Sequence, residues 1–132
     1  MSEHYEQCAL FTWARMYEER FPQFKMLFAV PNGGYRMSKT ARDLKAEGVR
    51  RGVPDVLYPV PKRVGEIGFA GLAIEMKFGK NKPTPEQEWW LGMLKLCGWR
   101  TAVCYDWQAA ARAIAEYEGI QLQFLGLGDE VE

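Results

Sequence analysis

Four ionisable side chains lie in otherwise apolar parts of the 132-residue sequence: Glu6, Asp55, Glu75 and Lys77. Glu75 and Lys77 are two residues apart in the segment 72–78, and because side chains alternate across a strand, both would project from one face of it. Removing a carboxylate or an ammonium group from water is costly unless another group binds it. These residues are therefore expected to bind a partner, either each other or a ligand.

Two carboxylates and a lysine suit the hydrolysis of a phosphate ester. Asp55 and Glu75 offer the oxygen ligands that Mg²⁺ prefers, and such a cation polarises a phosphoryl oxygen and lowers the pKa of a bound water. Lys77 would then orient that water or stabilise charge on the phosphate. The alternative is a structural ion pair between Lys77 and one of the acids, which an isolated Glu-x-Lys pattern favours because the pattern is short and common.

Two strands are expected to bring the acids together. Residues 56–60 form a mainly apolar segment directly after Asp55, and residues 72–78 form the second. A glycine-rich connection over residues 62–71 joins them, which favours an antiparallel hairpin with Asp55 beside Glu75. The face of the second strand opposite Glu75 is expected to lie in the core; it consists of Leu72, Ile74, Met76 and Phe78.

The first helix is expected over residues 3–20, ending before Pro22. Its apolar stripe consists of Leu10, Trp13, Ala14 and Tyr17. Glu6 lies one turn before Leu10 on this stripe, which makes it a candidate buried carboxylate. The alternative is that Glu6 is a first-turn acid that complements the dipole of its own helix.

Three further segments follow from local signals. The apolar run 26–30 predicts a short buried strand, and Pro31-Asn32-Gly33-Gly34 predicts a turn after it. A helix is expected over residues 38–48, with Ser38 as N-cap and with Ala41 and Leu44 facing inward.

The C-terminal third reads as helix, strand and helix. Thr84-Pro85-Glu86-Gln87 has the pattern of a capped helix start, and the helix that follows, to Gly98, is expected to be well buried because apolar residues surround most of it. A strand over 100–105 comes next, followed by a helix that is capped by Asp106, runs to about Tyr117 and is ended by Gly119. We expect one domain over residues 1–119 and a loose acidic tail over residues 120–132.

Composition predicts a soluble globular protein, with 48% hydrophobic and 26% charged residues. There is no apolar run long enough to span a membrane and no secretory signal, so a cytoplasmic location is expected. Cys8, Cys97 and Cys104 lack CxxC spacing and are expected to be buried free thiols. His4 is the only histidine and, near the chain end, a poor candidate for a general base.

Charge is balanced overall, with 17 basic and 17 acidic residues, but it is unevenly distributed. Residues 36–51 hold only two acids, Asp43 and Glu47, against six bases: Arg36, Lys39, Arg42, Lys45, Arg50 and Arg51. The segment is either a surface for a polyanion or a solvated helix face, and charge alone favours neither.

The order of these residues resembles a known family. Pro54-Asp55 followed by Glu75-x-Lys77 resembles the signature of the PD-(D/E)xK nuclease superfamily. More narrowly, the chain resembles a stand-alone virus-type replication-repair nuclease (VRR-NUC) domain of the phage or bacterial type. The segments that carry this resemblance span residues 3–118: Glu6-Gln7, Pro31-Asn32-Gly33-Gly34 with Arg36, Leu44-Lys45-Ala46-Glu47-Gly48-Val49, Gly52-Val53-Pro54-Asp55, Ile74-Glu75-Met76-Lys77, and Gln87 after Pro85.

The resemblance implies a role for each matching residue. Glu6, Asp55 and Glu75 would be metal ligands together with the main-chain carbonyl of Met76. Lys77 would be the catalytic lysine, and Gln87 would help to orient Lys77 or a phosphate. Phosphate contact then becomes the favoured role of the basic segment, which gives five expected DNA-binding residues: Arg36, Lys39, Arg42, Lys45 and Arg51.

The resemblance also implies a fold and an activity. The fold would be α/β and restriction-endonuclease-like, with a central mixed β-sheet flanked by α-helices. The activity would be endonucleolytic hydrolysis of DNA with Mg²⁺ or Mn²⁺ and no organic cofactor, by a homodimer acting on branched DNA such as Holliday junctions in DNA repair, within a bacterial or phage-infected cell. The alternatives are a flap-type or other nuclease preference, or a non-catalytic DNA-binding subunit with the same fold.

Overall fold

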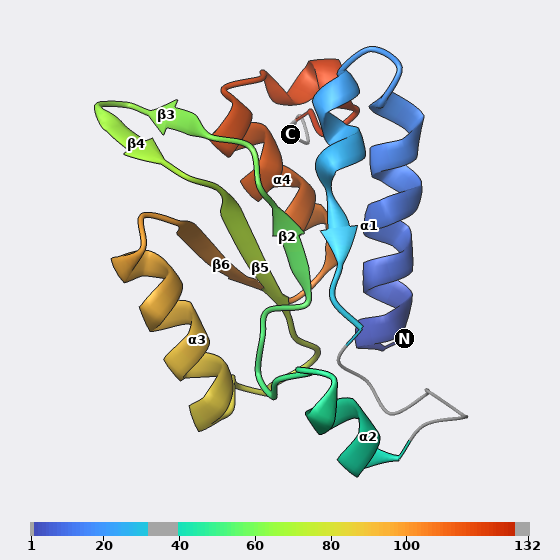
Figure 1. Cartoon of the computed structure of the whole chain (residues 1–132). Coiled ribbons are helices and arrows are strands. Elements are labelled where there is room, and N and C mark those ends of the chain that lie inside the picture. Colours follow the sequence, from blue (N-terminus) through green and yellow to red (C-terminus); the bar gives the residue numbers. More distant parts are fainter. Residues whose placement is uncertain (1, 32–39, 129–132) are drawn as a thin grey trace.

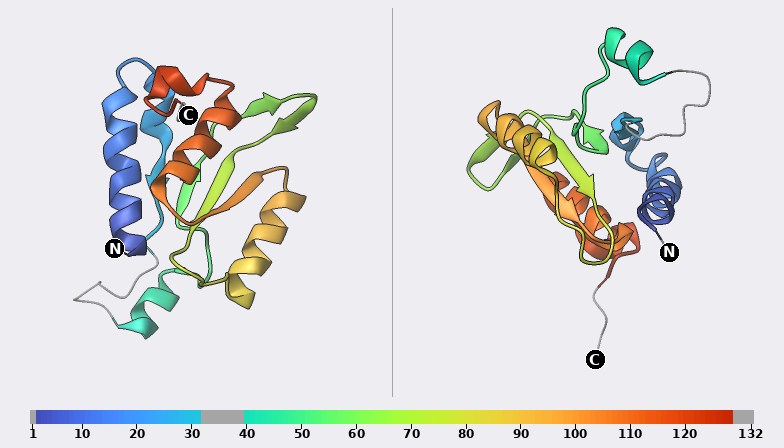
Figure 2. Two further views of the ribbon diagram at one scale, coloured as in Figure 1. Left: turned by 180° about the vertical axis from the view of Figure 1, so that it is seen from behind. Right: turned by 90° about the horizontal axis from the view of Figure 1, so that it is seen from below.

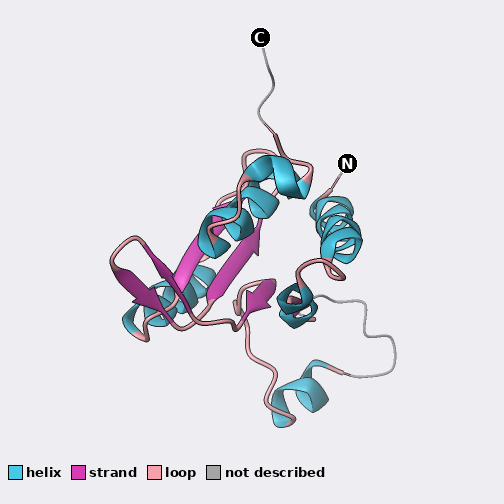
Figure 3. Ribbon diagram, turned by 90° about the horizontal axis from the view of Figure 1, so that it is seen from above, coloured by secondary structure: helices cyan, strands magenta, loops and turns pink. Residues whose placement is uncertain are grey.

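The computed structural model of the chain describes residues 2–31 and 40–128 and has a central four-stranded sheet with the order β1-β2-β5-β6 (Figure 1). The first three strands pair antiparallel, and β6 runs parallel to β5. A two-stranded sheet, β3-β4, extends away from α1 (Figure 3). The strands are β1 Phe28–Ala29, β2 Val56–Tyr58, β3 Lys62–Val64, β4 Ile67–Phe69, β5 Leu72–Met76 and β6 Arg100–Cys104.

Helices cover both faces of this sheet. α1 and α4 lie together on one side and α3 lies on the other, as the views in Figure 2 show. The helices are α1 Glu3–Tyr17, α2 Ala41–Ala46, α3 Pro85–Leu96 and α4 Trp107–Glu118, with 3-10 turns η1 Pro22–Met26 and η2 Leu122–Leu125. The prediction of an α/β domain with a mixed sheet between helices is therefore confirmed. None of the described helices is long and apolar enough to cross a membrane.

The core lies between β2, β5 and the helices α1 and α4. The predicted stripe of α1 is confirmed, because Leu10, Trp13 and Ala14 are buried and Glu6 is buried with them. Every residue of β5 is buried, which follows from its central position with helices on both faces. Phe78, expected in the core, is 37% exposed because β5 ends two residues earlier.

The expected strand pairing is confirmed, and its connection is more regular than predicted. β2 pairs antiparallel with β5, with Val56 opposite Ile74, which is the register that places Asp55 beside Glu75. Residues 62–71 were expected to be a glycine-rich connection, but most of them form the β3-β4 hairpin. Gly65, at its turn, has a φ of 64°, which only glycine adopts without strain.

Several expectations about the N-terminal half were wrong in detail. Residues 26–30 do not form a buried strand: β1 has two residues, both exposed, because it is the edge strand of the sheet. α2 is capped by Thr40, whose side chain accepts a hydrogen bond from Asp43 N. Ala41 is exposed and Leu44 only partly buried, so α2 is a surface helix. Residues 32–34 of the expected turn, and Ser38, lie outside the described part of the chain.

Burial differs from prediction in the C-terminal half. α3 begins and ends as expected, but Leu91 is its one buried residue. The segment 122–127 is not loose, because Leu125 and Leu127 are buried and Trp13 Nε1 donates a hydrogen bond to Leu125 O. The apolar spacing of α3 therefore did not distinguish a helix that packs on one face from a helix that is buried on all sides.

All three cysteines are free thiols, as predicted, but their burial differs from the prediction. Cys104 is buried, whereas Cys8 and Cys97 are exposed. Cys8 lies on α1, and Cys97 is the C-cap residue that follows α3.

Candidate active site

Asp55 and Glu75 meet at the end of the sheet where β2 begins and β5 ends. Asp55 Oδ2 accepts a hydrogen bond of 2.8 Å from Met76 N, which fixes its carboxylate against β5. Glu75 is 1% exposed, and its carboxylate oxygens have no N–H donor among the described residues, so a hydrogen bond between Glu75 and Asp55 needs a proton on one of the two carboxyl groups. Two ionised carboxylates accept hydrogen bonds but donate none, so this pair requires a proton or a cation between its oxygens.

The pKa values of Glu75 and Asp55 are both raised above their ordinary values. Burial raises the pKa of Glu75 to about 9, and the neighbouring charge of Asp55 adds to the shift, while the charge of Lys77 opposes it. Burial also raises the pKa of Asp55, which the hydrogen bond from Met76 N partly offsets. Two neighbouring carboxyl groups with raised pKa values, one buried and one half-buried, are typical of a functional site. The orphaned oxygens of Glu75 fit a hard divalent cation.

Lys77 lies on the same face as Glu75 and is 7% exposed. Its main-chain N donates to Cys104 O at 2.9 Å, which extends the β5-β6 ladder by one step. Within residues 2–31 and 40–128, Lys77 forms no ion pair, although its charge acts on both acids. The structural pair that a Glu-x-Lys pattern would favour is therefore not formed in this part of the chain.

Glu6 is buried, but its hydrogen bond points to α4. Glu6 Oε1 accepts a bond of 2.8 Å from Trp107 N, the first residue of that helix. The carboxylate thus satisfies a free N–H group at the start of α4 and joins two helices that lie side by side. Among the described residues, no three His, Cys, Asp or Glu side chains are close enough to hold a metal ion, so Glu6 does not form one cluster with Asp55 and Glu75 here.

Gln87 occupies the third position of α3, where it completes the predicted capping box. Gln87 Oε1 accepts from Thr84 N at 2.8 Å, and Thr84 Oγ1 accepts from Gln87 N at 3.2 Å. The turn before Asp55 packs on this helix start, because a Cβ on Gly52 would lie 2.9 Å from Gln87 N. Trp90 Nε1 also donates to Arg51 O at 3.0 Å. Gln87 is therefore held beside the segment that carries Asp55.

The predicted DNA-binding residues are only partly within the described chain. Arg42 and Lys45 are exposed on α2, and Arg51 is exposed in the turn that follows. Figure 1 shows α2 at the end of the sheet where β5 ends, which is the end that carries Asp55 and Glu75. Arg36 and Lys39 lie outside the described residues.

Tyr105 is a neighbour of the site that sequence reasoning missed. One step beyond the pairing of Met76 with Cys104, it lies opposite Lys77 on the parallel strand. Its side chain is 41% exposed, and its hydroxyl donates to Asn81 O at 2.8 Å. The order strand, helix, strand in the sequence predicts a parallel crossover and would have placed residue 105 here.

A second buried carboxylate, Glu118, differs from Glu75 because it is fully paired. Gln23 Nε2 and Lys62 Nζ each lie 3.0 Å from Glu118 Oε1, and the hydroxyl of Tyr58 donates to Oε2. This group ties α4, β2, β3 and η1 together at the end of α4 opposite Trp107. It is a structural ion pair, so among residues 2–31 and 40–128 the buried carboxylate without a donor is the one beside Asp55.

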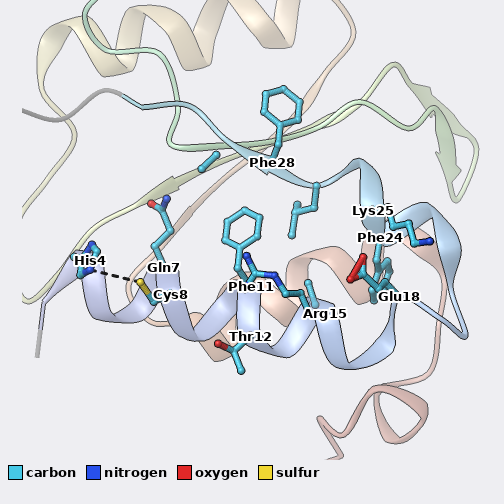
Figure 4. A pocket seen from close by; sticks show the side chains of 13 residues that line it. His4, Gln7, Cys8, Phe11, Thr12, Arg15, Glu18, Phe24, Lys25 and Phe28 are labelled. Atoms are coloured by element: carbon cyan, nitrogen blue, oxygen red, sulfur yellow. Dashed lines mark hydrogen bonds between the residues drawn. The ribbon is translucent and has the colours of Figure 1, made fainter. Parts of the chain in front are cut away.

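A groove of about 610 Å³ also lies along α1, next to η1 and β1 (Figure 4). Phe11, Arg15 and Phe28 line it, and His4 Nε2 lies 3.6 Å from Cys8 Sγ at one end. Asp55, Glu75 and Lys77 do not line this groove. The groove is therefore separate from the acidic pair at the strand ends.

Comparison with known proteins agrees with this architecture. A family model described as the VRR-NUC domain matches residues 2–107. A solved structure described as a "VRR_NUC domain protein" superposes with a TM-score of 0.71 and 24% identity, covering 98% of this chain and 92% of that one. A search of curated proteins found no match. With most of its length matched by the family model, the chain belongs to the VRR-NUC family, a nuclease domain of the PD-(D/E)xK type.

Proposed function

We propose that this nuclease domain is an endodeoxyribonuclease that depends on Mg²⁺ or Mn²⁺ and cleaves branched DNA, with four-way junctions as the preferred substrate. The observation that carries the proposal is the buried Glu75, which lies beside the half-buried Asp55 and on the same strand face as Lys77, and whose two oxygens have no hydrogen-bond donor among the described residues. A cation supplies the positive charge that this pair lacks.

Each residue has a distinct part in the proposed reaction. Asp55 and Glu75 would hold the cation together with the main-chain carbonyl of Met76. Glu6, the third expected ligand, would have to move toward them, because in the described chain its carboxylate bonds to Trp107 N and forms no cluster with the other two acids. When bound, a divalent cation stabilises charge on the phosphate and lowers the pKa of a water molecule. Lys77 would donate to the scissile phosphate or to the attacking water.

Gln87 and the basic residues would position the DNA. The oxygen of the Gln87 amide is used in the capping box, so its NH₂ group would be the part that orients a phosphate. Arg42, Lys45 and Arg51, together with Arg36 and Lys39, would contact backbone phosphates and bring the strand to the acids. A homodimer would present two such sites to opposed strands, as a junction requires.

Cleavage of labelled DNA tests the proposal. Duplex, flap and four-way-junction substrates are incubated with Mg²⁺, with Mn²⁺ and with a chelator, and the products are sized. We expect junction cleavage with either cation and none in chelator, and we expect Asp55→Asn and Lys77→Met to slow it about 100-fold or more. Glu66→Gln and Lys25→Met, which change exposed charges elsewhere, are the matched controls.

The same assay distinguishes the alternatives. Faster cleavage of flaps than of junctions would show that the domain prefers flaps, and the proposed metal-dependent mechanism would still hold. DNA binding without cleavage under any cation would instead indicate a non-catalytic subunit. Parent-like rates in both Asp55→Asn and Lys77→Met would show that the acidic pair is not the active site.

A further inference from the structure

α3 exposes an apolar stripe that no described part of the chain covers. Trp89 is 58% exposed, Met93 38% and Leu96 81%. Their spacing of four and three residues puts them on one face of the helix, and the buried Leu91 marks the opposite face, which packs on the sheet. Contiguous apolar surface of this kind marks an interaction site.

Gly92 lies beside this stripe in the middle of the helix. Glycine disfavours a helix interior, yet a Cβ at this position would meet no atom within 4 Å. No contact within the described chain therefore accounts for the glycine. Its missing side chain does leave a flat place on the helix surface, where the backbone of a second helix can approach closely.

Charges beside the stripe match a second copy of the same helix. Glu88 and Lys95 are exposed, and they lie four residues before and three residues after Gly92, on one flank. If two α3 helices cross antiparallel at Gly92, Glu88 of one copy and Lys95 of the other differ by one residue along the axis, about 1.5 Å. Trp89 of one copy and Leu96 of the other also differ by one residue along the axis, because they lie three residues before and four residues after Gly92.

We propose that α3 binds α3 of a second copy of this chain, antiparallel about a two-fold axis at Gly92. The interface joins Trp89 to Leu96 of the other copy and forms two Glu88–Lys95 ion pairs, which is the self-complementarity that a two-fold interface requires. The proposal rests on the homodimer proposed above and assigns its surface. Nucleic acid does not suit this surface, because Glu86 and Glu88 would face its phosphates.

The ring of Trp89 is already positioned for this contact. It packs edge to face on Trp90, with ring centroids 5.4 Å apart. Trp90 is in turn anchored by its hydrogen bond to Arg51 O. A large aromatic side chain that is held before binding loses little conformational freedom in an interface, so Trp89 serves as the anchor of the contact.

Light scattering after size-exclusion chromatography, repeated over a range of protein concentrations, tests the interface. The parent is expected to have the mass of two chains, and Leu96→Glu is expected to raise the dissociation constant about 100-fold and give the mass of one chain. Met16→Glu on α1, where the parent side chain is 70% exposed, is the matched control and should remain a dimer. Gly92→Gln should weaken the dimer without lowering the melting temperature of the monomer.

Charge exchange makes the test specific to the antiparallel arrangement. Glu88→Lys and Lys95→Glu should each weaken dimerisation about tenfold, and the double exchange should restore it. A monomeric parent would overturn both the homodimer and this interface. A dimer that survives Leu96→Glu would overturn the interface alone. If the parent dimerises through α3 but cleaves none of the DNA substrates, that result would count against the proposed function alone.

Discussion

Replacing Glu75 by Gln is expected to stabilise the cation-free protein and to stop DNA cleavage. The side chain is 1% exposed, its oxygens have no N–H donor among the described residues, and it lies beside Asp55. Glutamine has the same shape without the charge, and its amide can donate to the Asp55 carboxylate. An unsatisfied buried polar group costs about 1–3 kcal/mol, so a gain of that size is expected at neutral to alkaline pH.

The stability gained by Glu75→Gln over the parent should increase with pH, because the pKa of Glu75 is raised in the folded protein. A carboxyl with a pKa of about 9 in the folded protein and 4.5 ordinarily binds its proton more tightly when the chain is folded. Its contribution to stability is therefore complete below the ordinary value and is lost as the pH rises through about 9. The parent should lose this contribution and Glu75→Gln should not, so the two proteins should differ little near pH 5 and most above about pH 8.

Thermal denaturation in chelator, followed by circular dichroism at several pH values, measures this difference. A gain of 1–3 kcal/mol corresponds to a rise in melting temperature of about 3–10 °C for a chain of this size. Glu66→Gln, which removes an exposed acid, is the control and should leave the melting temperature unchanged. Added Mn²⁺ should stabilise the parent but not Glu75→Gln. A variant less stable than the parent above pH 8 would refute the reasoning, because the carboxylate would then have a partner in the folded protein.

Three further predictions concern the surroundings of the site. Exchanging both Arg42 and Lys45 for Ala should weaken DNA binding and reduce the slope of log affinity against log salt by about one for each phosphate that is no longer neutralised, as measured by fluorescence anisotropy in a salt series. Glu118→Ala leaves three donors without their shared acceptor and should cost about 3–5 kcal/mol in urea denaturation, with little effect on cleavage per folded molecule. Leu125→Ala should lower the free energy of unfolding by about 2–5 kcal/mol in the same assay, because this residue is fully buried. A change near zero would instead support the expectation that residues 120–132 form a loose tail.

Local patterns predicted the elements that carry the site. The capping box at Thr84 and Gln87, the caps at Asp106 and Gly119, and the stripe of the first helix were all identified correctly, since each depends on residues within a few positions of one another. The β2-β5 pairing was also predictable, because a short connection between two strands permits few arrangements.

Burial was predicted less well, because it depends on what packs against each element. α3 carries apolar residues on most of its surface, yet one side faces solvent. Residues 122–127 belong to the segment 120–132 that was expected to be a loose acidic tail, but they pack on α1 through Leu125. Composition gives a residue's preference for the core, but the number of neighbouring elements decides how much core is available.

The sequence by itself determined the family, the strand that carries Glu75 and Lys77, and the pairing that brings Asp55 to them, because these depend on local order and alternation. Only the tertiary structure decided how each carboxylate is satisfied. Glu6 bonds to α4, Glu118 is fully paired, and Glu75 is buried without an N–H donor in the described chain. The physical reason is that a hydrogen bond or a desolvation cost depends on which distant segments meet, and spacing along the chain does not encode that meeting.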